Sequence, residues 1–304
     1  MKKLGVIFPG QGSQKVGMLA GVNSAIVKPL FDEASTILGY DLLNLVNEGP
    51  TEKLNQTIYT QPAMLAADIV FWQAWISQHN TLPLVMAGHS LGEYSAFVAS
   101  GVLSFADGIR LVAKRAALMQ EAVPESEGAM AAVLGLDLES ITELCQTCSN
   151  EIDQVNAANI NAPGQIVVAG KRDVVEKFMQ VAKEAGAKKV VILPMSVPSH
   201  SYLMKPAADK LADFMETITF DQPKIPVINN VDAKVEHSVE RIKEALVRQL
   251  YSPVRWVDVI HAMVNLQVEQ IVECGPNRIL TGLTKRIATT EVVALSVNIN
   301  SEVE

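Results

Sequence analysis

The chain has 304 residues, of which 49% are hydrophobic and 19% are charged. This length and balance are typical of a globular protein with a full hydrophobic core, and they exclude the disordered and fibrous classes. The formal net charge of −8 argues against general nucleic-acid binding, which favours basic surfaces.

Signals for export or membrane insertion are weak along the chain. The apolar residues 4–8 imitate the start of a signal peptide, but Pro9-Gly10 interrupts them too early. The apolar segment 63–76 contains Asp68, which indicates a buried helix rather than a membrane span. We therefore expect a soluble, cytoplasmic protein with no membrane partner, and we expect it to be a monomer.

The first 124 residues alternate short apolar runs with helical periods, which predicts an α/β domain with a mainly parallel sheet. Ser104 and Asp107 form a capping box that opens the last of the predicted helices. The predicted buried strands cover residues 4–8 and 82–87, and the predicted helices cover residues 26–38, 62–77, 93–100 and 104–120.

A different pattern follows the linker-like stretch at Pro124, over residues 125–197. Its order of strand, helix, strand, strand, helix and strand predicts a ferredoxin-like α+β subdomain, inserted so that it forms one wall of a cleft. The strands are predicted at 129–134, 155–159, 165–169 and 189–193, and the helices at 140–148 and 174–185.

The larger catalytic domain resumes after this insert, so it is predicted to comprise residues 1–124 and 198–304. A helix is predicted over residues 201–216 in spite of Pro206. The remaining predicted elements are an extended segment at 223–229, helices at 241–250 and 257–264, a core strand at 270–273 and a closing helix that ends at Arg286.

Cys145 and Cys148 form a C-x-x-C pair, which could indicate a redox pair or half of a zinc site. The sequence has no second pair, and the surrounding residues predict a helix. We therefore interpret both as small apolar residues on one helix face, and we expect no metal and no cofactor.

The most informative motif is Gly88-His89-Ser90-Leu91-Gly92, which lies between a predicted strand and a predicted helix. A serine at the tip of so sharp a turn needs small residues two positions before and after it. The helix that follows directs its free N–H groups toward the serine, where an oxyanion would form. This context predicts a nucleophile elbow, and therefore acyl chemistry.

A serine nucleophile needs a base, and histidine is the usual one. His200 is the candidate because it lies at a predicted domain boundary, after a core strand and at the start of a helix. His89 lies inside the elbow and is expected to be structural, His79 and His237 are expected on the surface, and His261 could be either.

The sequence contains no clear candidate for a carboxylate that would orient His200. Asp232 and Asp258 are possible, but both have surface-like neighbours, which suggests that another group orients the ring. Arg115 lies among apolar helical neighbours, so it could bind a carboxylate in a partly buried space or form a structural salt bridge. The loop Gly10-Gln11 lacks the spacing of a dinucleotide site, and an oxyanion loop is the better interpretation.

Together these motifs resemble the malonyl-CoA:acyl carrier protein transacylases of fatty-acid synthesis, a family shared with the acyltransferase domains of polyketide synthases. The resemblance covers almost the whole chain and is carried by an ordered set of motifs, which are residues 8–14, 88–94, Arg115 and Met119, and residues 161–165, 197–201, 230–233, 249–250 and 273–276. Relatives often carry Gly-Lys after the proline where this chain has Asn277-Arg278.

The resemblance implies an α/β-hydrolase-like core with a ferredoxin-like insert. It also implies that Ser90 is the acylated nucleophile and His200 its base. The main-chain carbonyl of Gln249 would orient His200 in place of an acid, and the N–H groups of Gln11 and Leu91 would form the oxyanion hole.

For the substrate, the resemblance implies that Arg115 binds the free carboxylate of malonate. Met119 would line the same site, and Asn159 and Asn161 would contact the pantetheine or nucleotide end of malonyl-CoA. The expected reaction is a ping-pong transfer of malonyl from malonyl-CoA, through Ser90, to the thiol of acyl carrier protein.

Two alternatives stay open at this point. One is a serine esterase or thioesterase that uses water as the acceptor, and the other is a non-catalytic scaffold that binds carrier proteins. Acyl carrier proteins are acidic as a class, so an acidic transferase would need a local basic patch. Its candidate members are Lys183, Lys188, Lys189, Lys285 and Arg286, although ordinary solvated side chains would give the same pattern.

Overall fold

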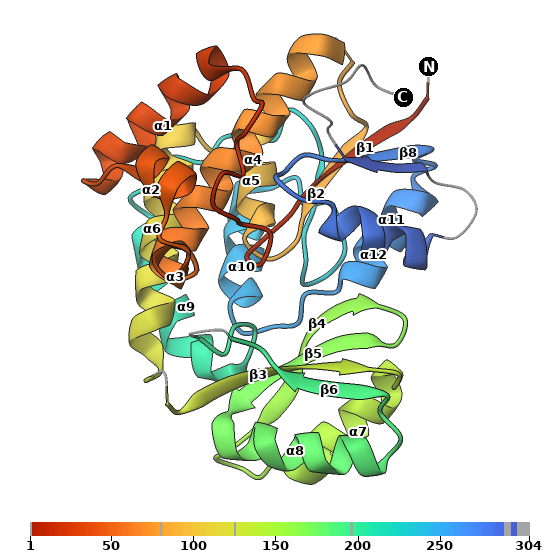
Figure 1. Cartoon of the computed structure of the whole chain (residues 1–304). Coiled ribbons are helices and arrows are strands. Elements are labelled where there is room, and N and C mark those ends of the chain that lie inside the picture. The colour runs from red at the N-terminus through yellow and green to blue at the C-terminus, as the bar shows by residue number, and fades with distance from the viewer. Residues whose placement is uncertain (1, 80, 125, 195–196, 289–292, 297–304) are drawn as a thin grey trace.

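The computed structural model describes residues 2–79, 81–124, 126–194, 197–288 and 293–296, and it contains two β-sheets (Figure 1). The larger sheet has the strand order β7-β2-β1-β8-β9, and all of its pairings are parallel. Its strands are β7 (Val227–Ile228), β2 (Val85–Gly88), β1 (Leu4–Phe8), β8 (Gln270–Glu273) and β9 (Val293–Ser296).

Both faces of this sheet are buried at β7, β2, β1 and β8, since successive residues of these four strands enter opposite cores. In β1, Val6 and Phe8 enter one core and Ile7 enters the other. The first core is built with α1 (Ser24–Leu38), α2 (Leu42–Glu48), α3 (Thr51–Leu54), α4 (Thr57–His79), α5 (Gly92–Ala99), α6 (Phe105–Ala122), α9 (Lys205–Met215) and α10 (Val239–Gln249). The second core is built with α11 (Trp256–Asn265) and α12 (Ile279–Ile287).

The register of the parallel strands brings three loops to one edge. Phe8 pairs with Gly88, and Ala87 pairs with Ile228, so β1, β2 and β7 end side by side. The carboxyl edge of a parallel sheet is where open α/β folds place their sites. The loops that start at Pro9, His89 and Asn229 therefore meet at this edge.

The smaller sheet is antiparallel, with the strand order β4-β5-β3-β6. Helices α7 (Leu138–Cys148) and α8 (Arg172–Glu184) cover one of its faces, and its other face is turned toward the rest of the chain (Figure 1). Its strands are β3 (Gly128–Leu134), β4 (Val155–Ala162), β5 (Gln165–Lys171) and β6 (Lys189–Ile192). The chain order β3-α7-β4-β5-α8-β6 is the predicted ferredoxin-like order.

Several predicted boundaries were wrong for identifiable reasons. The prediction contained neither α2 nor α3, and it contained no strand at Val293–Ser296. The fourth helix starts at Thr57 and carries Pro62 inside it, so His79 lies in its last turn, stacked on Trp75, rather than in a surface loop. A 3₁₀ turn, η1 (Tyr202–Met204), precedes α9 (Lys205–Met215), which places Pro206 in the first turn of the helix, where proline is favoured.

Within the described ranges, no helix is both long enough and apolar enough to cross a membrane. The same ranges contain no group of three or more His, Cys, Asp or Glu side chains that could hold a metal ion. Cys145 and Cys148 lie on α7 and are buried in its core against the small sheet.

Candidate active site

The turn between β2 and α5 holds Ser90 at a φ of +52°, a left-handed conformation that non-glycine residues rarely adopt. The flanking glycines are required by close backbone contacts. A Cβ at Gly88 would lie 1.9 Å from the carbonyl of Gly92, and a Cβ at Gly92 would lie 2.1 Å from the carbonyl oxygen of Phe8. A Cβ at Gly10 would lie 2.4 Å from the carbonyl oxygen of His89, so the loop after β1 is pressed against the elbow.

Ser90 and His200 form a hydrogen-bonded pair, with 2.7 Å between Ser90 Oγ and His200 Nε2. The other ring nitrogen, Nδ1, lies 2.7 Å from the main-chain oxygen of Gln249. A carbonyl oxygen can only accept, so Nδ1 carries the proton and Nε2 accepts from the serine hydroxyl. Burial, with a smaller contribution from the positive charge of Arg115, lowers the pKa of His200 to about 3. The ring is therefore neutral and able to take a proton.

Gln249, the last residue of α10, connects the groups around the elbow. Its Nε2 donates to the main-chain oxygen of Ser90 and to Glu93 Oε2, at 2.9 Å in each case. Its Oε1 accepts from Arg115 Nη2 at 3.1 Å. The side chain is fully buried, so this residue fixes His200 through its main chain and the elbow through its amide.

Arg115 projects from α6 into the interior beside Ser90 and is only 1% exposed. Its Nη1 donates to Gln61 Oε1 at 2.8 Å, and its Nη2 lies 3.4 Å from Ser90 Oγ. Its Nε has no partner, and among the described residues Arg115 makes no ion pair. Glu93 interacts electrostatically with this buried charge but forms no ion pair with it. A buried guanidinium that no carboxylate contacts is costly, so this position is suited to bind an anion next to the serine.

Gln61 and Met119 complete the wall around this arginine. Gln61 Nε2 lies 3.6 Å from the sulfur of Met119, while its oxygen accepts from Arg115. Met119 thus borders the predicted substrate site. Gln61 was not predicted, because its partners are distant along the chain and no local motif marks it.

Glu93, in the first turn of α5, was also missed, as was the role of Asn230. Glu93 Oε2 accepts from the N–H of Asn230 at 3.0 Å as well as from Gln249. Asn230 accepts from the N–H of Ser90 at 2.7 Å and donates to the oxygen of Gly88 at 2.7 Å. Burial raises the pKa of Glu93 to about 7. A glutamate three residues after the elbow serine, at a helix start with apolar neighbours, was the signal available in the sequence.

The two predicted oxyanion donors lie in the loops that the glycines hold together. Within the described residues, the main-chain N–H groups of Gln11 and Leu91 have no acceptor in the protein. The Gln11 side chain donates to Thr57 Oγ1 at 3.2 Å, so only the main-chain N–H of Gln11 is available for an oxyanion. Both groups are therefore free to receive a hydrogen-bond acceptor at this edge.

Asn159 and Asn161 lie on β4, the edge strand of the small sheet. The backbone of Asn159 forms a parallel bridge with Val254, and its side chain is largely buried. Asn161 Oδ1 lies 2.8 Å from Nε2 of His89. The structure thus ties Asn161 to the residue before Ser90, and the predicted contact with pantetheine stays a prediction.

Neither acidic candidate approaches His200. Asp232 forms a two-pronged ion pair with Arg248, with contacts of 3.0 and 2.5 Å, and Asp258 pairs with Arg255 at 2.8 Å. Both pairs are partly exposed. Among the described residues, the group in contact with His200 Nδ1 is the main-chain carbonyl of Gln249, and its orienting role stays a prediction.

Comparison with known proteins identifies the family. Residues 6–297 match the acyl transferase domain. The chain belongs to this family. The malonyl CoA-acyl carrier protein transacylase of Salmonella typhimurium is 52% identical over 292 residues, which cover 95% of this chain and 94% of that protein. This chain is therefore an acyltransferase.

Solved structures of family members have the same fold. The crystal structure of an acyl carrier protein S-malonyltransferase from Vibrio cholerae matches with a TM-score of 0.94 and 51% identity, over 97% of each chain. A malonyl-transacylase in complex with its type II PKS acyl-carrier protein matches with a TM-score of 0.94 and 51% identity, over 97% of this chain and 96% of that one. These matches confirm the predicted fold class of the acyltransferase.

Proposed function

We propose that this acyltransferase moves a malonyl group from malonyl-CoA to the phosphopantetheine thiol of an acyl carrier protein, and so supplies the extender unit for fatty-acid synthesis. The observation that carries the proposal is Arg115, a buried cation that contacts no carboxylate of the described residues, 3.4 Å from Ser90 Oγ. A malonyl thioester carries a free carboxylate that an acetyl thioester lacks. The names of the relatives point to the same two substrates.

In the first half-reaction, His200 Nε2 takes the hydroxyl proton of Ser90 while Oγ attacks the thioester carbon. The carbonyl oxygen becomes an oxyanion, which accepts hydrogen bonds from the N–H groups of Gln11 and Leu91. When the intermediate collapses, the carbon–sulfur bond breaks and the CoA sulfur leaves with the proton from His200. The malonyl ester remains on Ser90.

The second half-reaction reverses these roles. The thiol of the carrier protein gives its proton to His200, and its sulfur attacks the ester carbonyl of malonyl-Ser90. Collapse of the second intermediate breaks the bond to Oγ, which takes the proton back from His200. The free enzyme is restored, and the malonyl group is a thioester on the carrier protein.

Arg115 makes the enzyme selective for malonyl over acetyl groups. Its planar fork can donate two hydrogen bonds to one carboxylate, and burial strengthens them. An acetyl group would leave the guanidinium without an anion, and each missing hydrogen bond to a charged group costs about 1.5–3 kcal/mol. Met119 is proposed to border the same acyl pocket, and Asn159 and Asn161 to contact the pantetheine arm.

We further propose that residues 125–197 form an inserted subdomain, with 1–124 and 198–304 as the catalytic domain. The small antiparallel sheet and its two helices lie within the insert, which supports this division. The enzyme is proposed to act as a cytoplasmic monomer. It is also proposed to need no cofactor, because each step above uses only groups of the chain and its two substrates.

The test is the fate of the acyl group on Ser90. Wild-type protein is mixed with malonyl-CoA, and intact-protein mass spectrometry follows the malonyl adduct, with Ser90→Ala as the control. We expect an adduct on the wild type alone, which persists in buffer and moves to added holo acyl carrier protein. Prompt loss of the adduct to water, with no transfer, would instead identify a thioesterase.

A further inference from the structure

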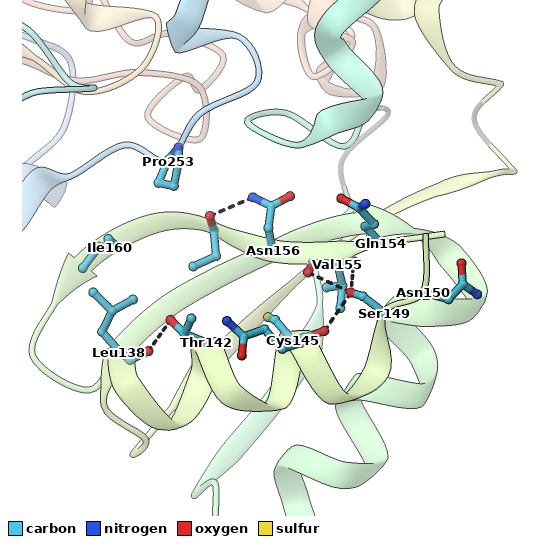
Figure 2. A pocket seen from close by; sticks show the side chains of 12 residues that line it. Leu138, Thr142, Cys145, Ser149, Asn150, Gln154, Val155, Asn156, Ile160 and Pro253 are labelled. Carbon is cyan, nitrogen blue, oxygen red and sulfur yellow. Dashed lines mark hydrogen bonds between the residues drawn. The ribbon is translucent and has the colours of Figure 1, made fainter. Parts of the chain in front are cut away.

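The edge strand β4 contacts the main chain of His200. Asn156, in this strand, donates from Nδ2 to the carbonyl oxygen of His200 at 2.9 Å and to the oxygen of Ala157 at 2.8 Å. Figure 2 shows Asn156 on the strand, at the border of a groove of about 620 Å³ that α7 and Pro253 also line. Asn156 is partly buried, and its side-chain hydrogen bonds go to neither Ser90 nor Arg115.

His200 needs such a contact because its backbone is strained. Its φ is +62°, a left-handed conformation that costs a non-glycine residue free energy unless neighbouring groups hold it. Two of its contacts come from one short segment, since its N–H donates to Leu250 O at 3.0 Å and its Nδ1 to Gln249 O. The contact to its carbonyl oxygen comes from Asn156 alone among the described residues.

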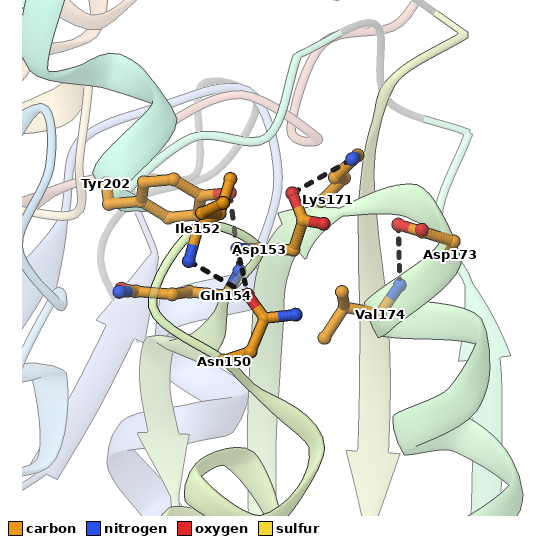
Figure 3. Close-up of polar contacts among 8 residues, drawn as sticks. All are labelled: Asn150, Ile152, Asp153, Gln154, Lys171, Asp173, Val174 and Tyr202. Atoms are coloured by element: carbon orange, nitrogen blue, oxygen red, sulfur yellow. Dashed lines mark hydrogen bonds and ion pairs between the residues drawn. The ribbon is translucent and has the colours of Figure 1, made fainter.

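The strand that carries Asn156 is itself braced at this point (Figure 3). Asn150 Oδ1 accepts from the N–H groups of Ile152 and Asp153, which fixes the turn before β4. The N–H of Gln154, the residue before β4, donates to the hydroxyl of Tyr202 at 3.3 Å, so the chain that leads into the strand contacts the segment just after His200. Hydrogen bonds therefore fix the backbone that leads to Asn156.

We propose that Asn156 is a positioning residue, which holds the strained main chain of His200 so that Nε2 stays in line with Ser90 Oγ. Without this donor the peptide after His200 can rotate, and the ring loses its fixed direction relative to the serine. Asn156 acts through His200 and touches no reacting atom. The inference rests on the proposed role of His200 as the base.

The test measures the reactivity of Ser90 in two ways, in the full-length protein. The first is the single-turnover rate of acylation by malonyl-CoA, with its concentration dependence. The second is the rate of inactivation by phenylmethanesulfonyl fluoride, a serine reagent that carries no carboxylate and does not depend on malonyl transfer. Gln146→Ala is the matched control, because Gln146 lines the same groove and its side chain is exposed.

For Asn156→Ala we expect both rate constants to fall together by about tenfold, because a small misplacement of a catalytic group is costly. The malonyl-CoA concentration at half-maximal rate should stay within about twofold of wild type, and Gln146→Ala should match wild type. Asn156→Asp keeps the shape of the side chain but lacks the Nδ2 donor, so it should lose at least as much. The circular dichroism spectrum and the melting temperature of each variant show the fraction that is folded.

Rates within about twofold of wild type in folded Asn156→Ala would overturn the inference. So would a loss that matches the unfolded fraction, or a weaker affinity for malonyl-CoA with an unchanged maximal rate. Failure of the proposed function would look different, because wild-type Ser90 would then react with the sulfonyl fluoride without passing malonyl to the carrier protein.

Discussion

At the residue scale, the charge that acts most strongly on His200 belongs to Arg115, the residue proposed to bind the malonyl carboxylate. Arg115 lies beside Ser90, and its positive charge is, after burial, the largest cause of the lowering of the pKa of His200 to about 3. A carboxylate bound to Arg115 would neutralise that charge and raise the pKa of His200. The correct acyl donor would therefore strengthen the base at the moment when it is needed.

The pH dependence of acylation follows from this pKa. The base must be unprotonated, so kcat/KM for loading of Ser90 by malonyl-CoA should stay nearly constant from about pH 8 down to about pH 5. A histidine with an unperturbed pKa of about 6.5 would instead cost half of the rate at about pH 6.5 and nearly all of it at about pH 5. Stopped-flow loading rates across this range would check the expectation.

Glu93 can titrate in the same range, since burial raises its pKa to about 7. The variant Glu93→Gln keeps an acceptor oxygen for Asn230 and Gln249 but cannot lose a proton in this range. Its profile should match that of the wild type on the acid side. A half-loss of rate near about pH 6.5 in both proteins would contradict the lowered pKa of His200.

Some residues of the site could be predicted from the sequence and others could not. Ser90 and His200 could be predicted, because a turn motif and a domain boundary mark them. Gln249 required the family resemblance, because an orienting main-chain carbonyl leaves no side-chain signal. Gln61 could not be predicted, since its contact with Arg115 exists only after α4 and α6 pack together.

At the element scale, the elbow is held by backbone contacts that no side chain can enter. Gly92→Ala would place a Cβ 2.1 Å from the carbonyl oxygen of Phe8. We expect it to lower the free energy of unfolding by about 3–5 kcal/mol, or to prevent folding. Urea denaturation followed by circular dichroism measures the change.

Gly282→Ala is the control for that substitution. Gly282 lies in α12, and a Cβ added there would meet no described atom within 4 Å. Alanine at this position should therefore stabilise the protein by about 1 kcal/mol. Equal effects of the two substitutions would mean that helix propensity, rather than the contact with Phe8, decides the result at Gly92.

The elements themselves were predictable where their patterns are long or strongly apolar. Residues 270–273 and 4–8 were predicted as strands with the observed bounds, because they are buried on both faces. The short helices α2 and α3 contain too few turns for a periodic pattern to appear. The start of α4 was misplaced because Pro62 resembles a helix start, although the helix accommodates it in its second turn.

At the scale of the whole molecule, an acidic protein carries a basic edge. The N–H of Lys188 donates to Leu134 O, and the N–H of Gly135 donates to Gly164 O. The end of β3, the start of β6 and the turn between β4 and β5 therefore lie at the same end of the small sheet. Arg286, from α12, contacts Gln165 and donates to Pro163 O at this end. Three of the five basic candidates therefore gather at one end of the small sheet, with Lys189 following Lys188 directly.

This edge is where an acidic carrier protein would be attracted. The double variant Lys188→Glu with Lys189→Glu should raise KM for the carrier protein roughly fivefold or more, without a change in the loading of Ser90 by malonyl-CoA. Lys28→Glu on α1 is the control, with the same kind of substitution at one exposed lysine elsewhere. An unchanged KM at low salt would show that docking uses another surface.

The charge of Arg115 is proposed to select the malonyl group, and the ratio of kcat/KM for malonyl-CoA to kcat/KM for acetyl-CoA measures this selection. In Arg115→Ala this ratio should fall by about 100-fold or more, since each of the two hydrogen bonds to the carboxylate is worth at least about 1.5 kcal/mol. Arg110→Ala, on the same helix but exposed and paired with Asp107, should leave the ratio unchanged. An Arg115→Ala enzyme that slows equally with both donors would contradict the proposal.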